Sequence, residues 1–478
     1  MQIFCVFGAN LMMVALGLSF SQSGYALPQL EDPKIGFSIS KEDGSWFASI
    51  LMIGCMIGAT SGGIKCDFMG RRKSILVDSI CYITINSMLS LSTNFTTLLA
   101  GRFLLGFVAS SAVVSLLMYS GEITQPQVRQ ITGPFSGVLF ALGTSLGLIF
   151  GAILPWRWAF AIGNLLPLSS FAIMLFAPES PVWYLTNHEE VLARKALEKL
   201  RGKINTDIID AEVTRIKTNM AADYIGENDR SNLQNIHDNV RLIFKPSFYK
   251  PFLVIYLLYC NLDWGGIVPA SFYIVPMLKD TQSPLDAYWI APILGTTRMI
   301  FAMLSVLTSM KLKRRPTYFI SASFMAFGTL LLSAYTYFEQ SFVEYPVMKW
   351  IPVFAIFILQ SACGYGTGTI PFTYLSELLP VHAKSLGNSL IGILAYFSLF
   401  WSVKTVPSLV HYLGLHGNFL LNCLSNVITI VICYFVMPET CGLTLEEIED
   451  IYRPQRKKIF VQDNESEQEN APIIQSKT

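Results

Sequence analysis

The sequence is poor in charged residues. Only 14% of its 478 residues are Asp, Glu, Lys or Arg, whereas soluble domains carry roughly 25%. So few charges do not cover a water-exposed surface, while 52% of the residues are hydrophobic. Twelve helices of about 20 residues would use roughly 240 residues, about half of the chain. This balance excludes a soluble enzyme of the same length and predicts an all-α protein that crosses the membrane many times.

Other features that the sequence lacks exclude further classes of function. The net charge is only +1, so electrostatics indicate no nucleic-acid partner. None of the nine cysteines has Cys-x-x-Cys spacing, so we expect no disulfide framework, no metal site and no other cofactor. The string Gly143–Gly147 matches a hydrolase nucleophile elbow, but it lies inside an apolar run without a strand-to-helix turn. The five histidines are scattered, and no Ser-His-Asp set is indicated.

Apolar runs separated by charges or turn residues predict twelve membrane spans. The first run lacks a positively charged region before it, so we expect a retained helix rather than a signal peptide. We expect a six-helix half at 1–176 and a second at 251–437. The predicted spans cover residues 4–27, 46–65, 74–92, 98–118, 133–153, 158–176, 251–274, 288–309, 317–336, 349–372, 387–408 and 417–437.

Two basic loops predict the orientation. They lie between spans two and three and between spans eight and nine, and therefore on the same side of the membrane. Their residues are Lys65, Arg71, Arg72, Lys73, Lys311, Lys313, Arg314 and Arg315. Because basic loops face the cytoplasm, we expect a multi-pass plasma-membrane protein with both termini in the cytoplasm.

Two polar segments should also lie on the cytoplasmic side. Residues 177–250 predict a helical linker, with one amphipathic helix beginning near Asn187 and stopping at Gly202, and another over 207–224. Residues 438–478 predict a cytoplasmic tail that is disordered after Arg453.

Two sites carry the Asn-x-Ser/Thr pattern for N-glycosylation. Asn94 lies in a short outer loop, where it is a candidate acceptor, whereas Asn464 lies on the cytoplasmic side and should stay unmodified.

The chain contains an internal repeat. Gly70-Arg71-Arg72-Lys73-Ser74 recurs in degraded form as Lys313-Arg314-Arg315-Pro316-Thr317. Glu122 with Arg129 recurs as Glu377 with Lys384, at the same seven-residue separation and 255 positions later. Pro178-Glu179-Ser180 recurs as Pro438-Glu439-Thr440. Parallel halves of this kind predict a solute path at their interface.

These motifs resemble those of the sugar porters of the major facilitator superfamily, and in particular of insect facilitated trehalose transporters. The match covers about 1–455 and includes Gly101-Arg102-Phe103, Pro181-x-Trp183-Tyr184 and Gly442-Leu443 besides the repeated motifs. The resemblance implies twelve helices in two pseudo-symmetric halves, and facilitative transport of a trehalose- or hexose-class sugar by alternating access. The partners would be a small solute and the lipid bilayer, and no oligomeric state is indicated.

The resemblance also implies an ion-pair latch that holds an inner gate shut, although the arginines alone would also serve to set the topology. The second half departs from the family at Met310 and Lys313, where an acid and a glycine are usual, so the resemblance does not imply a symmetric latch. Candidate gating residues are Asp67, Arg71, Arg72, Arg102, Glu122, Arg129, Glu179, Glu377, Lys384 and Glu439.

Span one contains no Asp or Glu. In proton-coupled relatives an acid there faces the arginine that matches Arg102, so its absence favours a facilitator, while Asp263 keeps a proton route open. Span ten contains Gly364, Gly366, Gly368 and Pro371, which predict a bent or broken helix that either lines the cavity as a gate or simply kinks. The glycines of span five predict close helix packing.

Few of the family's sugar-binding amides and indoles are present. Gly137, Leu262-Asp263, Val268, Phe372 and Ala395-Tyr396 occupy those positions, so the substrate does not carry over from the resemblance. The candidate cavity residues are Gly137, Asp263, Arg298, Thr369, Phe372, Thr373 and Tyr396, with Tyr374 beside them.

Asp263 and Arg298 lie near the middle of consecutive spans, where an unpaired charge costs at least about 2.5–3.5 kcal/mol. We expect them to pair, the alternatives being separate solvation in a wet cavity or an Arg298–Asn261 contact. Two further functions stay open: a carrier of the same fold for another polar or charged solute, and a nutrient sensor that does not transport.

Overall fold

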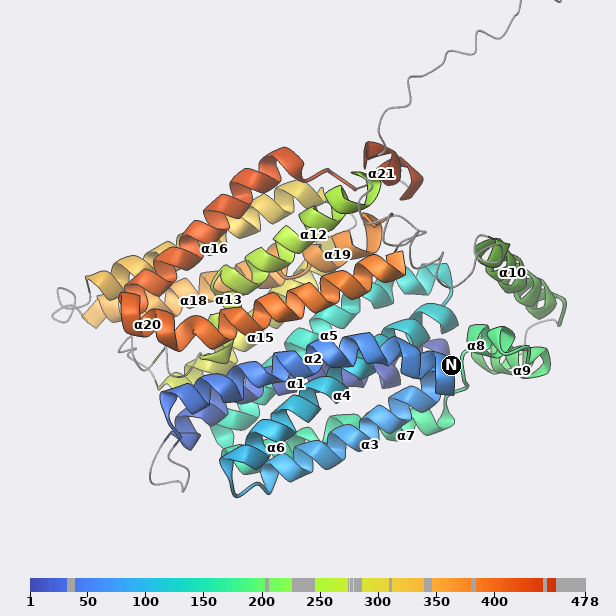
Figure 1. The fold of residues 1–478 in the computed structure, drawn as a ribbon, viewed down its shortest axis with the longest axis horizontal. Coiled ribbons are helices and arrows are strands. Elements are labelled where there is room, and N and C mark those ends of the chain that lie inside the picture. The colour runs from blue at the N-terminus through green and yellow to red at the C-terminus, as the bar shows by residue number, and fades with distance from the viewer. Residues whose placement is uncertain are drawn as a thin grey trace, which may run out of the picture.

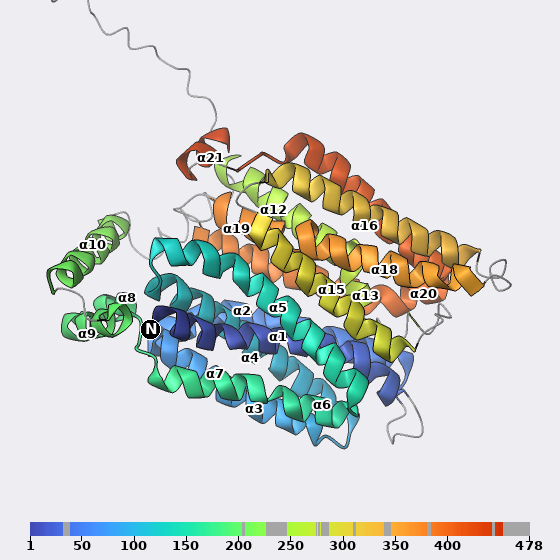
Figure 2. The same cartoon turned by 180° about the vertical axis from the view of Figure 1, so that it is seen from behind.

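The computed structural model is a bundle of long helices (Figures 1 and 2). It describes residues 1–31, 39–202, 206–225, 246–273, 275, 278, 286–308, 312–338, 346–379, 384–441 and 445–452. All regular elements in these residues are helical.

Seven helices form the N-terminal part of the bundle, shown in blue to green in Figure 1. They are α1 (Gln2–Leu30), α2 (Lys41–Met69), α3 (Arg71–Ser90), α4 (Phe95–Ile123), α5 (Pro126–Ile153), α6 (Trp156–Gly163) and α7 (Leu165–Phe176). Helices α6 and α7 are two parts of one crossing, Trp156–Phe176, interrupted at Asn164. We call α1–α7 the N-terminal helices.

The C-terminal helices lie beside them (Figure 1). They are α12 (Pro246–Trp264), α13 (Ile267–Phe272), α15 (Ala287–Thr308), α16 (Arg314–Tyr337), η2 (Pro346–Trp350), α18 (Ile351–Ala362), η3 (Cys363–Thr367), α19 (Ile370–Glu377) and α20 (Lys384–Val436). Helix α20 changes direction at Gly414, whose φ of 72° is not helical.

The predicted twelve crossings agree with the helices found. In the described part of the chain, nine helical stretches are long and apolar enough to cross a membrane. One of them, Gly387–Val436, contains two crossings because of the turn at Gly414. The more polar α3 and the pair α12–α13 supply the remaining two.

Close helix packing through glycines is confirmed for α1 and α5. A Cβ atom on Gly143 would lie 2.1 Å from the carbonyl oxygen of Val14, and one on Gly17 would lie 2.2 Å from that of Phe140. Nothing larger than glycine fits while these backbones touch.

The predicted break in span ten is confirmed. Residues Cys363–Thr367 form a π-helical turn between α18 and α19. Ser321 of α16 holds this turn, because its hydroxyl donates to the carbonyl of Ala362 and accepts from the N–H of Thr367 (2.9 Å). A π-turn of this kind marks functional sites in many helices.

The linker is helical, as predicted, and contains one more helix than expected. Its helices are α8 (Pro181–Thr186), α9 (Glu190–Arg201) and α10 (Thr206–Ile225), and they lie at the end of the bundle that carries the N-terminus (Figures 1 and 2). Helix α9 ends at Gly202 as predicted, but its start was wrong: the N-cap is Glu189, while Asn187 ends α8. The sequence signal was ambiguous because an amide caps either end of a helix.

One short helix follows the last crossing. Helix α21 (Leu445–Tyr452) buries Ile448 and Tyr452 in a cluster that includes Ile255 and Leu258 of α12. Helix α21 is therefore docked against α12. Residues 453–478, and with them Asn464, lie outside the described residues.

Candidate functional site

A network of charges joins α2, α3, α4 and the segment before α8. The Arg71 guanidinium lies 3.2 Å from Asp67 and 2.9 Å from Glu122. The carboxylate of Glu179 accepts the backbone N–H groups of Arg72 (2.8 Å) and Lys73 (3.3 Å), at the start of α3. Arg71 is thus paired with two of the acids named from the sequence. We call this end of the bundle the basic-loop end.

The C-terminal helices repeat the network more faithfully than the sequence led us to expect. Arg314 pairs with Glu377, and Glu439 accepts the N–H groups of Arg314 and Arg315, each at 3.1 Å. In the alignment of the repeat, the N–H groups that Glu439 accepts are one position earlier than those that Glu179 accepts. The shift has a physical reason: Pro316 stands at the position of Lys73 and has no N–H to donate.

Two tyrosines complete the repeated framework. The hydroxyl of Tyr119 donates to the carbonyl of Pro178, and that of Tyr374 donates to the carbonyl of Pro438, both at 2.8 Å. The two tyrosines are 255 positions apart, the spacing already found for Glu122 and Glu377. Tyr374 was expected to line a cavity, but its side chain is fully buried in this framework.

Each network lies within one of the two groups of helices. Arg71–Glu122 joins N-terminal helices only, and Arg314–Glu377 joins C-terminal helices only. Among the described side chains, no ion pair at this end joins the two groups. The side chains of Arg129 and Lys384, and all of Met310, lie outside the described residues.

Polar contact between the two groups is found at the opposite end. The Lys404 ammonium of α20 lies 2.7 Å from the Ser45 hydroxyl and 4.0 Å from the centre of the Trp46 ring, both on α2. The rings of Phe20 and Phe272 meet at 5.7 Å, joining α1 to α13. These contacts close the bundle at the end away from the basic loops.

Arg102 of α4 is buried beside α1 and has only neutral partners there. Its guanidinium donates to the carbonyl of Ser19 (2.8 Å), the side-chain oxygen of Gln22 (2.8 Å) and the hydroxyl of Ser23 (2.6 Å). It also lies over the ring of Phe47, at 4.8 Å. The arrangement confirms that span one faces Arg102 without a carboxylate.

The expected Asp263–Arg298 pair is not formed. Asp263 is 4% exposed and its Oδ2 has no hydrogen-bond partner among the described residues, while the Arg298 guanidinium lies over the ring of Phe140, 5.7 Å from its centre. The two residues lie on helix faces that point to different neighbours. The Ser402 hydroxyl of α20 donates to the backbone carbonyl of Asp263 at 2.6 Å. The Asp263 segment packs against α20, whereas Arg298 faces α5.

The alternative partner of Arg298 is also not used. The amide nitrogen of Asn261 donates to the Tyr318 hydroxyl at 3.0 Å, and the amide oxygen has no hydrogen-bond partner in the part of the chain that the structure describes. Arg298 is half-buried and makes no hydrogen bond or ion pair with the described residues.

The other candidate cavity residues lie in different surroundings. A Cβ atom on Gly137 would meet nothing within 4 Å. The Thr369 hydroxyl lies 3.1 Å from that of Ser305, and Thr373 donates to the Thr369 carbonyl. Phe372 is 52% exposed and meets the Tyr259 ring edge-on.

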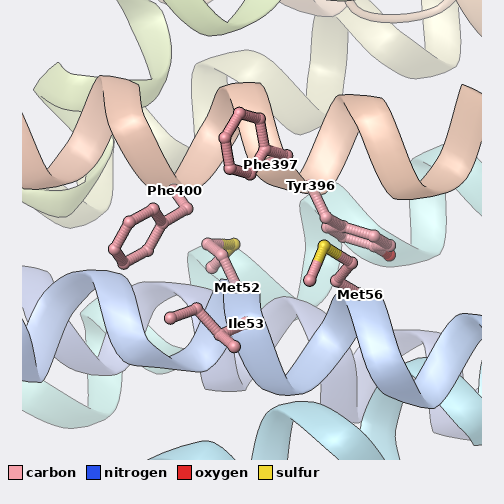
Figure 3. A pocket seen from close by; sticks show the side chains of 6 residues that line it. All are labelled: Met52, Ile53, Met56, Tyr396, Phe397 and Phe400. Carbon is pink, nitrogen blue, oxygen red and sulfur yellow. The ribbon is translucent and has the colours of Figure 1, made fainter.

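Tyr396 joins the two groups of helices. Its hydroxyl lies 3.5 Å from that of Ser110 on α4. It also lines a small pocket between α2 and α20, which Figure 3 shows. Sugar recognition requires several polar groups, and this lining is almost wholly apolar, so we do not assign the pocket to a sugar. The pocket is lined by Met52, Ile53, Met56, Tyr396, Phe397 and Phe400.

The repeated frameworks and the two groups of helices agree with a comparison of the sequence against family models. The model described as "Sugar (and other) transporter" matches residues 6–452. The chain belongs to this sugar transporter family.

Curated members of the family include insect trehalose transporters. The facilitated trehalose transporter Tret1-2 homolog of Drosophila simulans is 28% identical over 454 residues, which cover 94% of this chain and 90% of the relative. The facilitated trehalose transporter Tret1 of Drosophila yakuba is 29% identical over 94% of this chain, which spans only 51% of that longer relative. In Polypedilum vanderplanki, Tret1 is 28% identical, with 94% and 87% covered.

Solved structures show the same fold. The inward-open xylose transporter XylE from E. coli superposes with a TM-score of 0.76 at 18% identity, covering 95% of this chain and 100% of that one. Its partially occluded inward-open form gives a TM-score of 0.75 at 17% identity, with 93% and 99% covered. Identity this low establishes the major facilitator fold and nothing about the solute.

One buried ion pair of this sugar transporter was missed from the sequence. Lys65 of α2 pairs with Asp78 of α3, and its ammonium also lies 2.7 Å from the Ser111 hydroxyl of α4. Lys65 was counted only as a topology signal. Asp78, a carboxylate inside a predicted span, was the available clue.

Asn94 serves as the N-cap of α4. Its side-chain oxygen accepts the backbone N–H of Thr97 at 2.7 Å, and the residue is exposed. Attachment of a glycan at this amide stays a prediction, and it would have to preserve or replace the cap.

Proposed function

We propose that this protein is a facilitative carrier for a trehalose- or hexose-class sugar, working by alternating access between the N-terminal and C-terminal helices. One observation supports this most strongly. Each group is braced internally by the same framework at the basic-loop end, while the groups meet through Lys404 and Ser45 at the other end. Two groups that are each braced internally, and that share a polar contact away from those braces, suit a rocking motion about a central solute site.

Facilitation without proton coupling is supported by the surroundings of Arg102. A carboxylate beside an arginine binds and releases a proton as the pair breaks and forms. Ser19, Gln22 and Ser23 offer only neutral oxygens, so this position has no group that titrates near neutral pH.

The orientation forms part of the same proposal. The basic-loop end, the linker helices and both chain termini face the cytoplasm of a plasma-membrane protein. The supporting observations are the basic residues at this end and the position of the N-terminus and α8–α10 beside it (Figures 1 and 2). A tag at Ser231 should therefore resist impermeant reagents in intact cells, and labelling there would reverse the orientation.

Uptake into vesicles containing the purified protein tests the function. We expect labelled trehalose or glucose to enter, to exchange with unlabelled sugar inside, and to enter no faster when a proton gradient is imposed. Protein-free vesicles are the control, and an amino-acid panel tests the wider solute class. Acceleration by the proton gradient would contradict facilitation, and binding without exchange would favour a sensor.

A further inference from the structure

Arg298 is a charged side chain in the middle of a membrane helix, and the described residues give it no charged partner. It is the twelfth of the 22 residues of α15. No carboxylate among the described residues lies within 4 Å of it, and its contact is the ring of Phe140. A ring face stabilises a guanidinium by about 0.5–2 kcal/mol, which satisfies none of its five N–H donors.

The side chain points into the bundle rather than to lipid. The exposed large hydrophobic residues of α15 all lie on the side opposite Arg298. They are Trp289, Ile293, Ile300, Met303, Leu304 and Leu307, and the seven-residue spacing of Ile293, Ile300 and Leu307 marks the middle of this lipid-facing stripe. Arg298 is five residues from Ile293, about 140° around the helix. Its partial exposure therefore faces the interior, where the neighbouring Leu294 is buried.

Two features beside Arg298 suit a sugar. Gly137, one turn from Phe140 on α5, leaves open space where a side chain would stand. Ser305 is seven residues beyond Arg298 on α15, within about 20° of the same face and about 10 Å along the axis. Its hydroxyl and that of Thr369 lie 3.1 Å apart, and they offer polar groups to a bound solute.

We propose that Arg298 binds the carboxylate of a monoanionic sugar, of the uronate or aldonate class, during transport. The planar guanidinium matches a carboxylate with two parallel hydrogen bonds, and a single negative charge neutralises the site in a low-dielectric interior. Asp263 does not compete, because it packs against α20. The inference rests on the proposed carrier function and names its substrate class.

Competition between charged and neutral sugars tests the assignment. We measure uptake of labelled glucuronate and labelled glucose into vesicles containing the parent, Arg298→Gln or Arg298→Lys. The matched control is Arg157→Gln, because Arg157 is also half-buried and lies over an aromatic ring, Trp156, at 4.8 Å, in the helix pair α6–α7. Glucose 6-phosphate serves as a second competitor that separates a carboxylate site from a phosphate site.

We expect the parent to prefer glucuronate, and Arg298→Gln to lose about 10- to 100-fold of its glucuronate uptake, the worth of a charge-assisted bidentate contact. Glucose uptake by Arg298→Gln should stay equal or rise, Arg298→Lys should retain part of the glucuronate uptake, and Arg157→Gln should behave as the parent.

Glucose uptake without glucuronate uptake, an equal loss of both sugars in Arg298→Gln, or stronger competition by glucose 6-phosphate would each overturn the carboxylate site while leaving the carrier function intact. Uptake of neither sugar, with no rise in the parent's Tm on adding glucuronate, would overturn both the site and the carrier function.

Discussion

The neutral surroundings of Arg102 yield a residue-scale prediction about the transport mechanism. Its partners on α1 are neutral, and Gln22 supplies the side-chain oxygen at 2.8 Å. We predict that Gln22→Glu places a carboxylate against Arg102 and makes uptake depend on pH, whereas the parent changes less than about twofold between about pH 5 and pH 8. Uptake at a series of pH values measures the difference.

Gln29→Glu is the matched control for that variant. Gln29 lies on the same helix two turns further on, where its oxygen accepts the backbone N–H of Trp156 at 2.9 Å, away from Arg102. A pH dependence equal in both variants would mean that a carboxylate anywhere on α1 has this effect. The argument from Arg102 would then fail.

The Lys65–Asp78 pair makes a second residue-scale prediction. Asp78 is 4% exposed, so Lys65→Met leaves an uncompensated carboxylate and should lower stability by about 3 kcal/mol. Asp78→Asn should cost less, because the Lys65 side chain is 20% exposed. The double variant Lys65→Met/Asp78→Asn should recover most of the loss. Thermal unfolding in detergent measures the cycle, and strictly additive shifts would show that the pair contributes nothing.

Residue types alone did not predict the surroundings of Asp263 and Arg298. Their depth followed from their positions within the spans, but their rotation about the helix axes did not enter the pairing argument. For Arg298 the apolar stripe of α15 held that information, because Ile293, Ile300 and Leu307 mark the lipid side. For Asp263 no such signal exists, since its neighbour Ser402 comes from a helix 139 positions later.

At the scale of elements, glycines gather at two helix breaks, and the sequence analysis predicted only one of them. Span ten carries three glycines and a proline, and it breaks. The break in span seven at Gly265–Gly266, where Gly266 has a φ of +98°, escaped notice. Its freed carbonyl at Gly265 is satisfied by Asn426 (3.0 Å), a residue 161 positions away that local sequence does not connect to it.

The π-turn of span ten yields an element-scale prediction. A Cβ atom on Gly364 would lie 2.4 Å from the Arg298 carbonyl oxygen, which is backbone and does not yield easily. Gly364→Ala should therefore separate η3 from α15 and lower stability by about 1–3 kcal/mol. The control is Gly392→Ala in α20, which meets nothing within 4 Å and should be neutral or gain about 0.5–1 kcal/mol. Equal shifts in Tm would contradict the packing argument.

At the scale of the whole molecule, the internal repeat predicted more than the family pattern did. Departures at Met310 and Lys313 argued against a symmetric second network, yet Glu377 and Glu439 find the same kinds of partner as Glu122 and Glu179. The backbone supplies the missing donors, since an N–H is available at every residue except proline. A comparison of residue types between the two halves does not show that backbone N–H groups take this role.

The contact between Lys404 and Ser45 yields a prediction for the whole molecule. If transport requires α2 and α20 to separate at the end away from the basic loops, tying them together there should stop it. We predict that Ser45→Cys/Lys404→Cys, joined by a short reducible cross-linker in a background without the native cysteines, loses uptake and regains it on reduction. Sugar exchange in vesicles provides the measurement.

The control ties two helices of the same group at the same end. The Asn164 amide donates to the Ser87 hydroxyl at 2.9 Å, joining the start of α7 to α3. Cross-linked Ser87→Cys/Asn164→Cys should transport normally, because these helices move together. Normal uptake by cross-linked Ser45→Cys/Lys404→Cys would mean that this end does not open during transport. The solute path would then not run between α2 and α20, and rocking of two rigid groups would be the wrong description.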